Sequence, residues 1–328
     1  MKIKKLHIKN FKSLVDLEIV EPNPFTVFVG ANGVGKSNIF EALEFVSYSK
    51  TPNLVDLFGG ITSVMTFGKS SLPEISIEAF DIEYSISIDD EDYISGVKVN
   101  SLPGSKDVKE YLNSQQKKIS FELINKISRI FIGKYNYLKV KLDGESRLNL
   151  ACTNLEKVLK RLLSDENKRE EITEYLQLLI PGFEKVEIHS DNIGGTDSLL
   201  IYEVDSKKPF TKNLISDGTY NIICLLTAVF QSDEPQFLCI EEPENGLSPY
   251  AIEVLVEMFR SKCEDNGHII WLNTHSQTLV RHLKEDEMIL VNKIDGKTQI
   301  KQLEKGAFYG LNADEAWLTN ALGAGLPW

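Results

Sequence analysis

The residues best suited to chemistry in this chain form a glycine-rich loop that ends in a lysine and a serine. The loop matches the phosphate-binding pattern G-x-x-x-x-G-K-[ST] and reads Gly30-Ala31-Asn32-Gly33-Val34-Gly35-Lys36-Ser37. Glycines let the backbone approach a phosphate, and successive N–H groups hold the anion. We expect Lys36 to reach the β- and γ-phosphates of ATP and the Ser37 hydroxyl to coordinate Mg²⁺. The predicted nucleotide-binding set also includes Asn38, directly after the loop.

An acidic pair ends a strongly apolar run more than 200 residues later. The run is Phe237-Leu-Cys-Ile, and Glu241 and Glu242 follow it. Parallel sheets place their ligand chemistry at the carboxyl ends of strands. We therefore assign Glu241 to the magnesium ion, directly or through water. We assign Glu242 to orienting or deprotonating the water that attacks the γ-phosphate.

Three shorter motifs accompany the loop and the acidic pair. Ser216-Asp217-Gly218-Thr219 precedes an apolar helix, where it can cap the helix or bind an anion through backbone N–H groups. His275 follows the next apolar strand, from which it can reach a γ-phosphate. Lys12 lies in the turn between the first two predicted strands. It can contact a nucleotide phosphate or base edge, or be an ordinary surface lysine.

The elements around these motifs predict an α/β fold. Alternating and apolar runs predict strands over residues 2–9, 14–20, 25–29, 236–241, 268–273, 288–293 and 298–303. Helical spacing predicts helices over residues 37–47, 218–231, 249–262 and 277–283. Strands that alternate with helices favour a mostly parallel sheet, and the glycine loop sits between a buried strand and a helix, as its pattern requires.

The middle of the chain has a different pattern. Residues 75–88 alternate as in a half-exposed antiparallel sheet, and residues 106–121 and 155–180 carry helical spacing up to Pro181. Sustained heptads are not visible, so a short helical lid is expected rather than a long coiled coil. We therefore predict an ATPase lobe over 1–70, an inserted α+β region over 71–210 and a second ATPase lobe over 211–328.

Composition narrows the class of protein. The chain has 328 residues, of which 42% are hydrophobic and 26% are charged, which is typical of a globular protein. It shows neither a signal-peptide core nor a run of about 20 apolar residues, so we expect a cytoplasmic protein without membrane partners. Four scattered cysteines favour buried thiols. The net charge of −12 disfavours a surface coated with nucleic acid. The clustered lysines are nevertheless compatible with a local basic groove.

The order of the motifs resembles that of ABC-type ATPases of the SMC, RecF and OLD kind. The motifs are Phe11-Lys12-Ser13, the Gly30–Ser37 loop, Ser216–Thr219, Glu241-Glu242-Pro-Glu-Asn-Gly-Leu and Thr274-His275-Ser276. The chain resembles the OLD-like AAA branch, which is widespread in bacteria and often linked to phage defence. The resemblance covers about residues 1–60 and 210–295. It implies a P-loop ATPase head with a mixed sheet, split by the central insertion.

This resemblance also implies a mechanism. Such heads dimerise head to tail, and each ATP lies between the glycine loop of one subunit and the signature of the other. Ser216 and Gly218 would then cap the γ-phosphate in trans, Glu242 would polarise water, and His275 would sense or stabilise the γ-phosphate. ATP would join the subunits, and its hydrolysis would release them.

The chain departs from the family pattern at several places. Glu241 stands where many relatives carry aspartate, Ser248 stands where histidine is frequent, and the region Leu57–Gly60 holds no clear Gln-loop. OLD nucleases carry a Toprim domain after the ATPase, and the tail after His275 is too short for one. The tail includes Trp317 and Trp328, which could anchor a partner or pack on the core.

The leading hypothesis is therefore an ATPase that senses or regulates within an anti-phage complex and controls a separate Toprim-like nuclease. DNA is a further candidate partner. The alternative is a RecF-like module in which ATP gates DNA binding during repair. A third reading, the ATPase of a membrane importer, is disfavoured by the missing Gln-loop and the Glu-Glu-Pro-Glu-Asn-Gly run.

Overall fold

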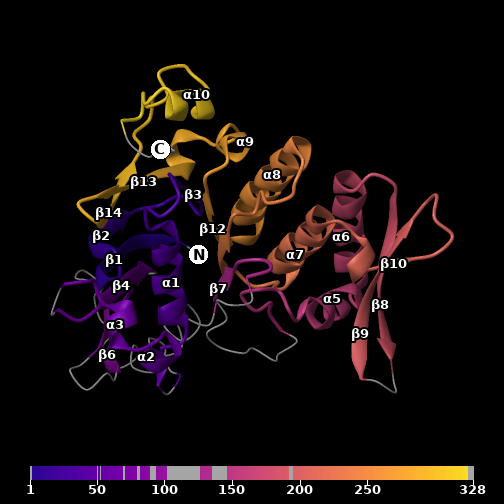
Figure 1. Cartoon of the computed structure of the whole chain (residues 1–328), viewed down its shortest axis with the longest axis horizontal. Coiled ribbons are helices and arrows are strands. Elements are labelled where there is room, and N and C mark those ends of the chain that lie inside the picture. Colours follow the sequence, from indigo (N-terminus) through magenta and orange to yellow (C-terminus); the bar gives the residue numbers. More distant parts are fainter. Residues whose placement is uncertain are drawn as a thin grey trace.

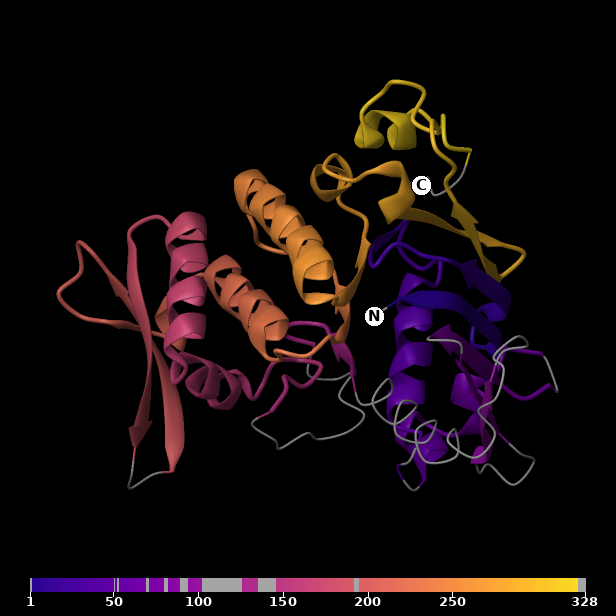
Figure 2. The same cartoon turned by 180° about the vertical axis from the view of Figure 1, so that it is seen from behind.

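The computed structural model describes residues 2–49, 51, 53–68, 71–79, 82–88, 94–101, 126–134, 146–191 and 195–323. In these ranges the chain forms three sheets with helices between and beside them (Figure 1). Two of the sheets and the helix that follows the glycine loop lie in one half of the molecule. The helices α5–α8 and the third sheet lie in the other half (Figures 1 and 2). No helix in the described ranges is both long and apolar enough to span a bilayer.

The central sheet carries the predicted motifs and runs in the order β14-β13-β3-β12-β11-β7. Its strands are β3 (Phe25–Val29), β7 (Ile127–Ile130), β11 (Phe237–Glu241), β12 (Ile269–Thr274), β13 (Met288–Ile294) and β14 (Lys297–Gln302). All neighbours pair in parallel except β13 and β14, which form an antiparallel hairpin. Every residue of β3, β11 and β12 is buried, as expected for strands covered on both faces. The predicted mixed α/β sheet is confirmed.

A five-stranded antiparallel sheet covers one side of the central sheet, with α1 (Lys36–Ser47) between them. Its order is β2-β1-β4-β5-β6, with β1 (Ile3–Phe11), β2 (Leu14–Val20), β4 (Glu74–Ala79), β5 (Ile82–Ile88) and β6 (Ile94–Ser101). One hydrophobic cluster joins this sheet, α1 and every second residue of the central strands, such as Phe28 and Trp271. Because α1 is buried on both sides, its first turn is held firmly beside the sheet edge.

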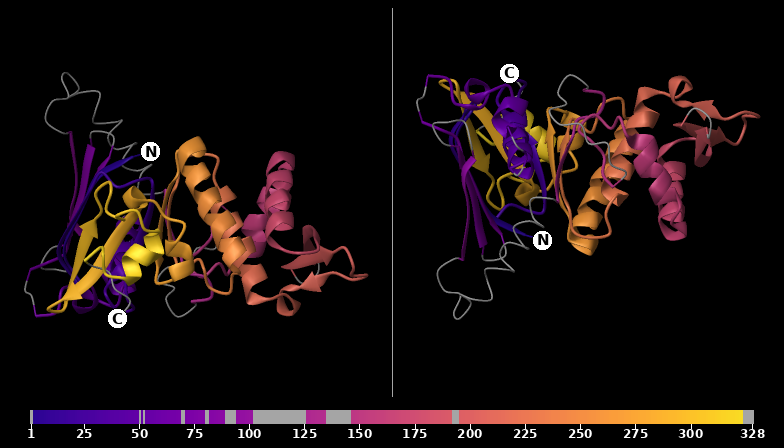
Figure 3. Two further views of the ribbon diagram at one scale, coloured as in Figure 1. Left: turned by 90° about the horizontal axis from the view of Figure 1, so that it is seen from above. Right: turned by 90° about the horizontal axis from the view of Figure 1, so that it is seen from below.

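A second hydrophobic cluster lies on the opposite face of the central sheet and includes four helices, of which α8 packs against β3 and β12. The four helices are α5 (Leu155–Leu163), α6 (Glu166–Leu179), α7 (Asp217–Phe230) and α8 (Pro249–Asn266). The alternate central residues, such as Val27 and Leu272, belong to this second cluster. A three-stranded sheet of β10 (Phe210–Thr211), β9 (Thr196–Glu203) and β8 (Phe183–Asp191) closes the far end of the molecule (Figure 3).

Short elements complete the described structure. They are α2 (Leu54–Leu57), α3 (Ile61–Val64), η2 (Lys212–Leu214), α9 (Gln277–Val280), η3 (Glu285–Glu287) and α10 (Ala313–Leu318). Trp317 of α10 is fully buried and belongs to the core on the helical side, so this part of the tail packs on the core. Trp328 lies outside the described residues.

The middle of the chain supplies strands to both large sheets. The antiparallel alternation of residues 75–88 is confirmed as β4 and β5, and β4 also pairs with β1. Further along, β7 pairs in parallel with β11. The predicted helical stretch 155–180 is two helices, because Asp165 caps a new start at α6. The stretch 106–121 lies outside the described residues, and the division at residues 70 and 210 stays a prediction.

Candidate nucleotide-binding site

The glycine loop joins β3 to α1 and wraps around the start of that helix. Gly33 and Gly35 both adopt left-handed backbone conformations, with φ of 76° and 102°. A Cβ atom at Gly35 would collide with the Thr298 hydroxyl, and one at Gly30 would collide with the Val291 carbonyl. A Cβ atom at Gly33 would meet open space. The outer side of the loop, at Gly33, is therefore the side open to a phosphate.

Lys36 folds back over its own loop. Its Nζ donates hydrogen bonds to the carbonyl oxygens of Gly30 and Ala31, each at 2.7 Å. Burial lowers the pKa of Lys36 to about 8, although the carboxylates of Glu242, Glu244 and Glu241 act to raise it. This ammonium group is held within the loop, where a bound phosphate would compensate for its burial better than carbonyl oxygens do.

The predicted metal ligands lie side by side. Ser37 Oγ donates a hydrogen bond to Glu241 Oε2 at 2.5 Å, which joins residues 204 positions apart in the sequence. Asn273 Nδ2 also donates to Glu241 Oε2, at 3.2 Å. This arrangement follows from topology, since β12 lies between β3 and β11 and all three strands end at the same edge. The serine and the acidic strand thus meet where the sequence predicts.

Glu242 begins the turn after β11 in a strained conformation, with φ of 48°. Its backbone N–H donates a hydrogen bond to the Asn273 carbonyl at 3.0 Å. Its carboxylate accepts a hydrogen bond from Asn245 Nδ2 at 3.0 Å and lies 3.9 Å from His275 Nδ1. His275 thus faces the predicted general base from the end of the neighbouring strand, and both side chains keep some exposure to solvent.

A third carboxylate, Glu244, lies close to this pair and was given no role by the sequence reasoning. Its Oε1 accepts a hydrogen bond from Thr274 Oγ1 at 2.5 Å. Its Oε2 is buried and has no hydrogen-bond partner among the described residues. Burial raises the pKa of Glu244, and the nearby Glu242 charge adds to that effect. An unpartnered buried oxygen beside the loop indicates a polar site that a ligand or water would complete.

Lys12 and Asn38 point to protein partners rather than to the open side of the loop. Lys12 Nζ donates a hydrogen bond to Glu41 Oε2 of α1 at 2.5 Å. Asn38 Nδ2 donates to Ser13 Oγ at 2.7 Å, beneath the loop. Nucleotide contacts by these two residues stay predictions. Thr298 Oγ1 donates a hydrogen bond to the Val34 carbonyl at 2.7 Å, so the β13–β14 hairpin supports the glycine loop from behind.

The predicted signature starts α7, where Ser216 and Asp217 are exposed and Gly218 is buried. Ser216 Oγ accepts a hydrogen bond from the Thr219 N–H at 3.1 Å, which makes Ser216 the helix N-cap that its position suggested. Gly218 packs against the Gly246 carbonyl so closely that a Cβ atom would collide with it. Among the described residues, the hydrogen bonds of Ser216 stay within the first turn of α7 and reach no residue of the glycine loop.

The residues present fit magnesium-bound ATP by their chemistry. The loop offers backbone N–H groups, an open glycine and a lysine, which suit phosphates. Ser37 and Glu241 offer adjacent oxygen atoms, which suit a hard cation. Among the described residues no group of three or more histidine, cysteine or acidic side chains could hold a metal unaided. Mg²⁺ commonly takes one or two ligands from a protein and the others from water and substrate phosphates.

Sequence reasoning missed the buried partners of Glu241. Arg129 on β7 donates from Nε to Glu241 Oε1 at 2.6 Å and from Nη1 to Glu44 Oε2 at 2.7 Å. Asn273, just before the Thr274-His275 motif, contacts both Glu241 and Glu242. A lone arginine within the apolar run Ile127–Ile132 was the available signal for Arg129.

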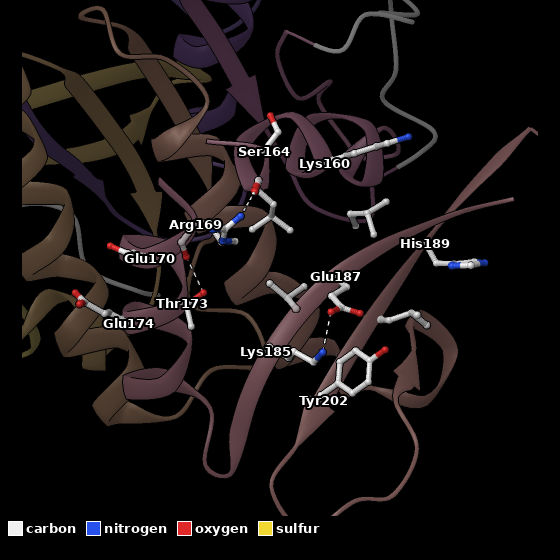
Figure 4. Close-up of a pocket in the computed structure, with 14 residues that line it drawn as sticks. Lys160, Ser164, Arg169, Glu170, Thr173, Glu174, Lys185, Glu187, His189 and Tyr202 are labelled. Atoms are coloured by element: carbon white, nitrogen blue, oxygen red, sulfur yellow. Dashed lines mark hydrogen bonds and ion pairs between the residues drawn. The ribbon is translucent and has the colours of Figure 1, made fainter. Parts of the chain in front are cut away.

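A separate groove lies between α5, α6 and the β8–β9 hairpin (Figure 4). It has a volume of about 890 Å³, and Lys185 there forms an ion pair with Glu187 at 2.8 Å. None of the residues that line this groove belongs to the predicted motifs. Its lysines, arginine and glutamates are interleaved, so the groove presents no surface of one charge.

Solved structures with a similar fold are heads of SMC proteins. A structure described as the SmcHead bound to the C-winged helix domain of ScpA superimposes with a TM-score of 0.64, covering 93% of this chain and 99% of that chain at 15% identity. The SMC head domain from Thermotoga maritima gives a TM-score of 0.54 over 93% of this chain and 100% of that chain, at 18% identity. The fold and the loop define a P-loop ATPase with the SMC head fold.

Sequence comparison identifies the family. The family model described as "AAA domain, putative AbiEii toxin, Type IV TA system" matches residues 25–281, and the chain belongs to this family of AAA ATPases. An ATP/GTP phosphatase of Helicobacter pylori is 20% identical over 332 aligned positions, which cover 86% of this chain and 88% of that protein. The chromosome partition protein Smc of Methanocaldococcus jannaschii is 50% identical over 44 residues, only 13% of this chain and 4% of that protein.

Proposed function

We propose that the chain hydrolyses Mg²⁺-bound ATP at the edge of the central sheet. The observation that carries this proposal is the 2.5 Å hydrogen bond between Ser37 and Glu241, which joins the phosphate loop to the acidic strand. Lys36 and the loop N–H groups bind the phosphates, and Ser37 and Glu241 hold the metal. Bound Mg²⁺ neutralises part of the phosphate charge.

In this proposal Glu242 and His275 act on the water and the γ-phosphate. Glu242 orients the attacking water and accepts its proton, because its carboxylate lies at the carboxyl end of β11 beside the predicted metal ligand. His275 stands on the neighbouring strand end, where it donates to or senses the γ-phosphate. The hydrogen bond from Asn245 limits the rotation of the Glu242 carboxylate and fixes its direction.

We further propose that two copies form a head-to-tail dimer with ATP at the interface. Ser216 and Asp217 are exposed, and the preceding Leu214 leaves 67% of its surface exposed. An exposed leucine beside an exposed helix start suits a surface that a partner covers. Ser216 and Gly218 of one copy would then face the γ-phosphate held by the other copy.

The wider role that we propose is regulation of a separate effector, a Toprim-like nuclease, in an anti-phage complex. The description of the family, "putative AbiEii toxin, Type IV TA system", supports a role in a multi-component bacterial system that includes a toxic effector. An SMC head of the same fold is described as bound to a domain of another protein, which supports a protein partner. The net charge of −12 favours a protein partner over a DNA-coated surface.

Nucleotide turnover and oligomeric state test the core of the proposal. Purified protein should hydrolyse ATP slowly in Mg²⁺, and Lys36→Ala should abolish turnover. Glu242→Gln should bind ATP without cleaving it and so accumulate a dimer, measured by light scattering after size exclusion. Unchanged turnover in Lys36→Ala would refute the assignment of the loop, and a Glu242→Gln variant that stays monomeric in ATP would refute the dimer.

The regulatory role needs a second experiment in cells. The chain and its neighbouring genes should protect bacteria from phage, and Lys36→Ala or Glu242→Gln should remove that protection. Duplex DNA binding by the purified chain that requires ATP and falls steeply with salt would instead support the RecF-like alternative. Protection that survives both substitutions would contradict a role for ATP in defence.

A further inference from the structure

A buried arginine ties the predicted metal carboxylate to two other elements. Arg129 lies on β7, in register with Cys239 of β11, and its side chain is only 3% exposed. Its Nε donates to Glu241 Oε1 at 2.6 Å, and its Nη2 forms an ion pair with the same oxygen. Its Nη1 donates to Glu44 Oε2 of α1 at 2.7 Å. The guanidinium group therefore bridges the acidic strand and the helix that follows the phosphate loop.

The charges in this cluster favour a permanently ionised arginine. Burial alone would lower the pKa of Arg129, but the carboxylates of Glu241 and Glu44 raise it above its usual value. Burial raises the pKa of Glu44, and Arg129 opposes that rise. The side chains of Glu44 and Glu241 are 6% and 1% exposed, so water does little to screen these contacts. Loss of the arginine would leave two buried carboxylates close together without a cation.

The two oxygens of Glu241 consequently have separate partners. Oε1 is occupied by Arg129, whereas Oε2 faces the Ser37 hydroxyl and the Asn273 amide. Glutamate has one more rotatable bond than aspartate, so its carboxylate needs more restraint to point one way. Groups behind a metal ligand commonly supply such restraint and strengthen metal binding. Here the restraint comes from β7, the outermost strand of the sheet on that side.

We propose that Arg129 is a positioning residue for the Mg²⁺ site, which holds Glu241 Oε1 so that Oε2 faces Ser37. Glu44 fixes Arg129 in turn from α1, seven residues after Ser37 and hence on the same side of that helix. The inference rests on the proposed function, because it concerns the metal that accompanies ATP. Arg129 itself touches neither nucleotide nor metal in this scheme.

Manganese binding provides a readout that does not depend on turnover. Electron paramagnetic resonance measures free Mn²⁺ in a titration of the protein saturated with a non-hydrolysable ATP analogue. We expect Arg129→Gln to weaken Mn²⁺ binding about tenfold or more, because removal of a group that hydrogen-bonds to a metal ligand typically has an effect of this size in metalloproteins. In turnover assays, the Mg²⁺ concentration for half-maximal rate should rise by a similar factor, while KM for ATP at saturating Mg²⁺ changes less than about twofold.

A second buried arginine supplies a matched control. Arg260 on α8 binds Glu287 through Nε at 2.6 Å and Nη2 at 2.9 Å, and its guanidinium lies 5.8 Å from the ring centre of Phe25, on the helical side of the sheet. Arg260→Gln should destabilise the fold, measured as a lower Tm, and leave Mn²⁺ binding unchanged. If Arg129→Gln fails to fold, Arg129→Lys keeps the charge but places all its donors on a single nitrogen, and should weaken Mn²⁺ binding less than tenfold but measurably.

The outcomes separate this inference from the proposed function. Analogue-dependent Mn²⁺ binding by the wild type that Lys36→Ala abolishes supports the site itself. With that result in hand, a folded Arg129→Gln or Arg129→Lys variant with wild-type Mn²⁺ affinity overturns the positioning role, and the ion pair is then purely structural. A wild type that binds neither the analogue nor Mn²⁺ overturns the proposed function and this inference with it.

Discussion

Asn245 joins the Glu242 carboxylate to the helix that carries the predicted signature. Its Nδ2 donates to Glu242 Oε2 at 3.0 Å, and its backbone carbonyl accepts a hydrogen bond from Asn221 Nδ2 of α7 at 2.7 Å. α7 begins directly after Ser216. In the proposed head-to-tail dimer, the start of α7 would face the ATP bound to the partner's glycine loop, while Glu242 would act on the ATP bound to its own chain. Asn245 would therefore connect the two ATP sites of the dimer.

Removal of the Asn245 side chain should impair catalysis more than binding. We expect Asn245→Ala to lower kcat by roughly ten- to a hundredfold, because the Glu242 carboxylate loses the group that aims it. KM for ATP should change little, since the hydrogen bonds of Asn245 in the described structure go to Asn221 and Glu242 and not to the phosphate loop. Asn266→Ala, at an exposed asparagine that ends α8, is the control and should keep the wild-type rate. A wild-type kcat in Asn245→Ala would contradict this account.

The glycines of the loop should separate into structural and ligand-facing positions. Gly35→Ala should reduce the free energy of unfolding by about 1–3 kcal/mol, because its Cβ collides with the Thr298 hydroxyl at a left-handed position. Gly33→Ala should cost only about 1 kcal/mol, the cost of the left-handed backbone alone. Its methyl group would nevertheless stand on the open side of the loop and weaken ATP binding.

Urea unfolding and nucleotide titration test these two variants together. Gly296→Ala is the control, because Gly296 also has a left-handed backbone with open space at its Cβ position and lies in the β13–β14 turn. It should match Gly33→Ala in stability and keep wild-type affinity for ATP. Equal stability of the Gly33→Ala and Gly35→Ala variants would show that the Thr298 contact does not matter.

Much of the site could be predicted because each of its motifs is a short continuous segment of the chain. The glycine loop carries its own pattern, and an apolar run followed by Glu241 and Glu242 places both carboxylates at the end of a buried parallel strand. Parallel strands end at a common edge, which is why Ser37 and Glu241 meet across 204 positions. Ser216 as a helix cap also follows from residue type and the apolar helix after it.

Other features depend on pairings that a single sequence does not encode locally. β7 has four residues, and the choice of β11 as its neighbour rests on packing between segments more than 100 positions apart. Arg129 acquires its role only through that pairing. The burial of Glu244 likewise depends on the end of β12, which supplies Thr274. The strand order β3-β12-β11, which puts His275 between the loop and the acidic pair, is also a property of the assembled sheet.

The contact between Gly218 and Gly246 predicts a sensitive point in the signature. A methyl group at Gly218 would collide with the Gly246 carbonyl and push the start of α7 away from the turn after Glu242. We expect Gly218→Ala, added to Glu242→Gln, to lose the ATP-dependent dimer in light scattering. Its binding of ATP as a monomer should remain within about threefold, since the loop is untouched. Retention of the dimer would argue against a close role of this helix start at the interface.

A buried histidine far from the loop should make stability depend on pH. His268 precedes β12, is 2% exposed, and its Nδ1 has no hydrogen-bond partner among the described residues. Burial lowers the pKa of His268 to about 4, and the nearby Lys262 charge adds to the effect. The unfolded chain therefore binds a proton at this residue between pH 6.5 and about 4 while the folded chain does not, so acidification favours unfolding.

Replacement of His268 should flatten this dependence. From pH 7.5 to pH 4, the wild type should lose up to about 3 kcal/mol of unfolding free energy relative to His268→Gln, since each unit of pKa difference corresponds to about 1.4 kcal/mol. Urea unfolding at several pH values measures the difference. His189→Gln, at an exposed histidine of β8, should follow the wild-type curve. Parallel curves for the wild type and His268→Gln would mean that His268 is protonated in the folded chain as readily as in the unfolded one.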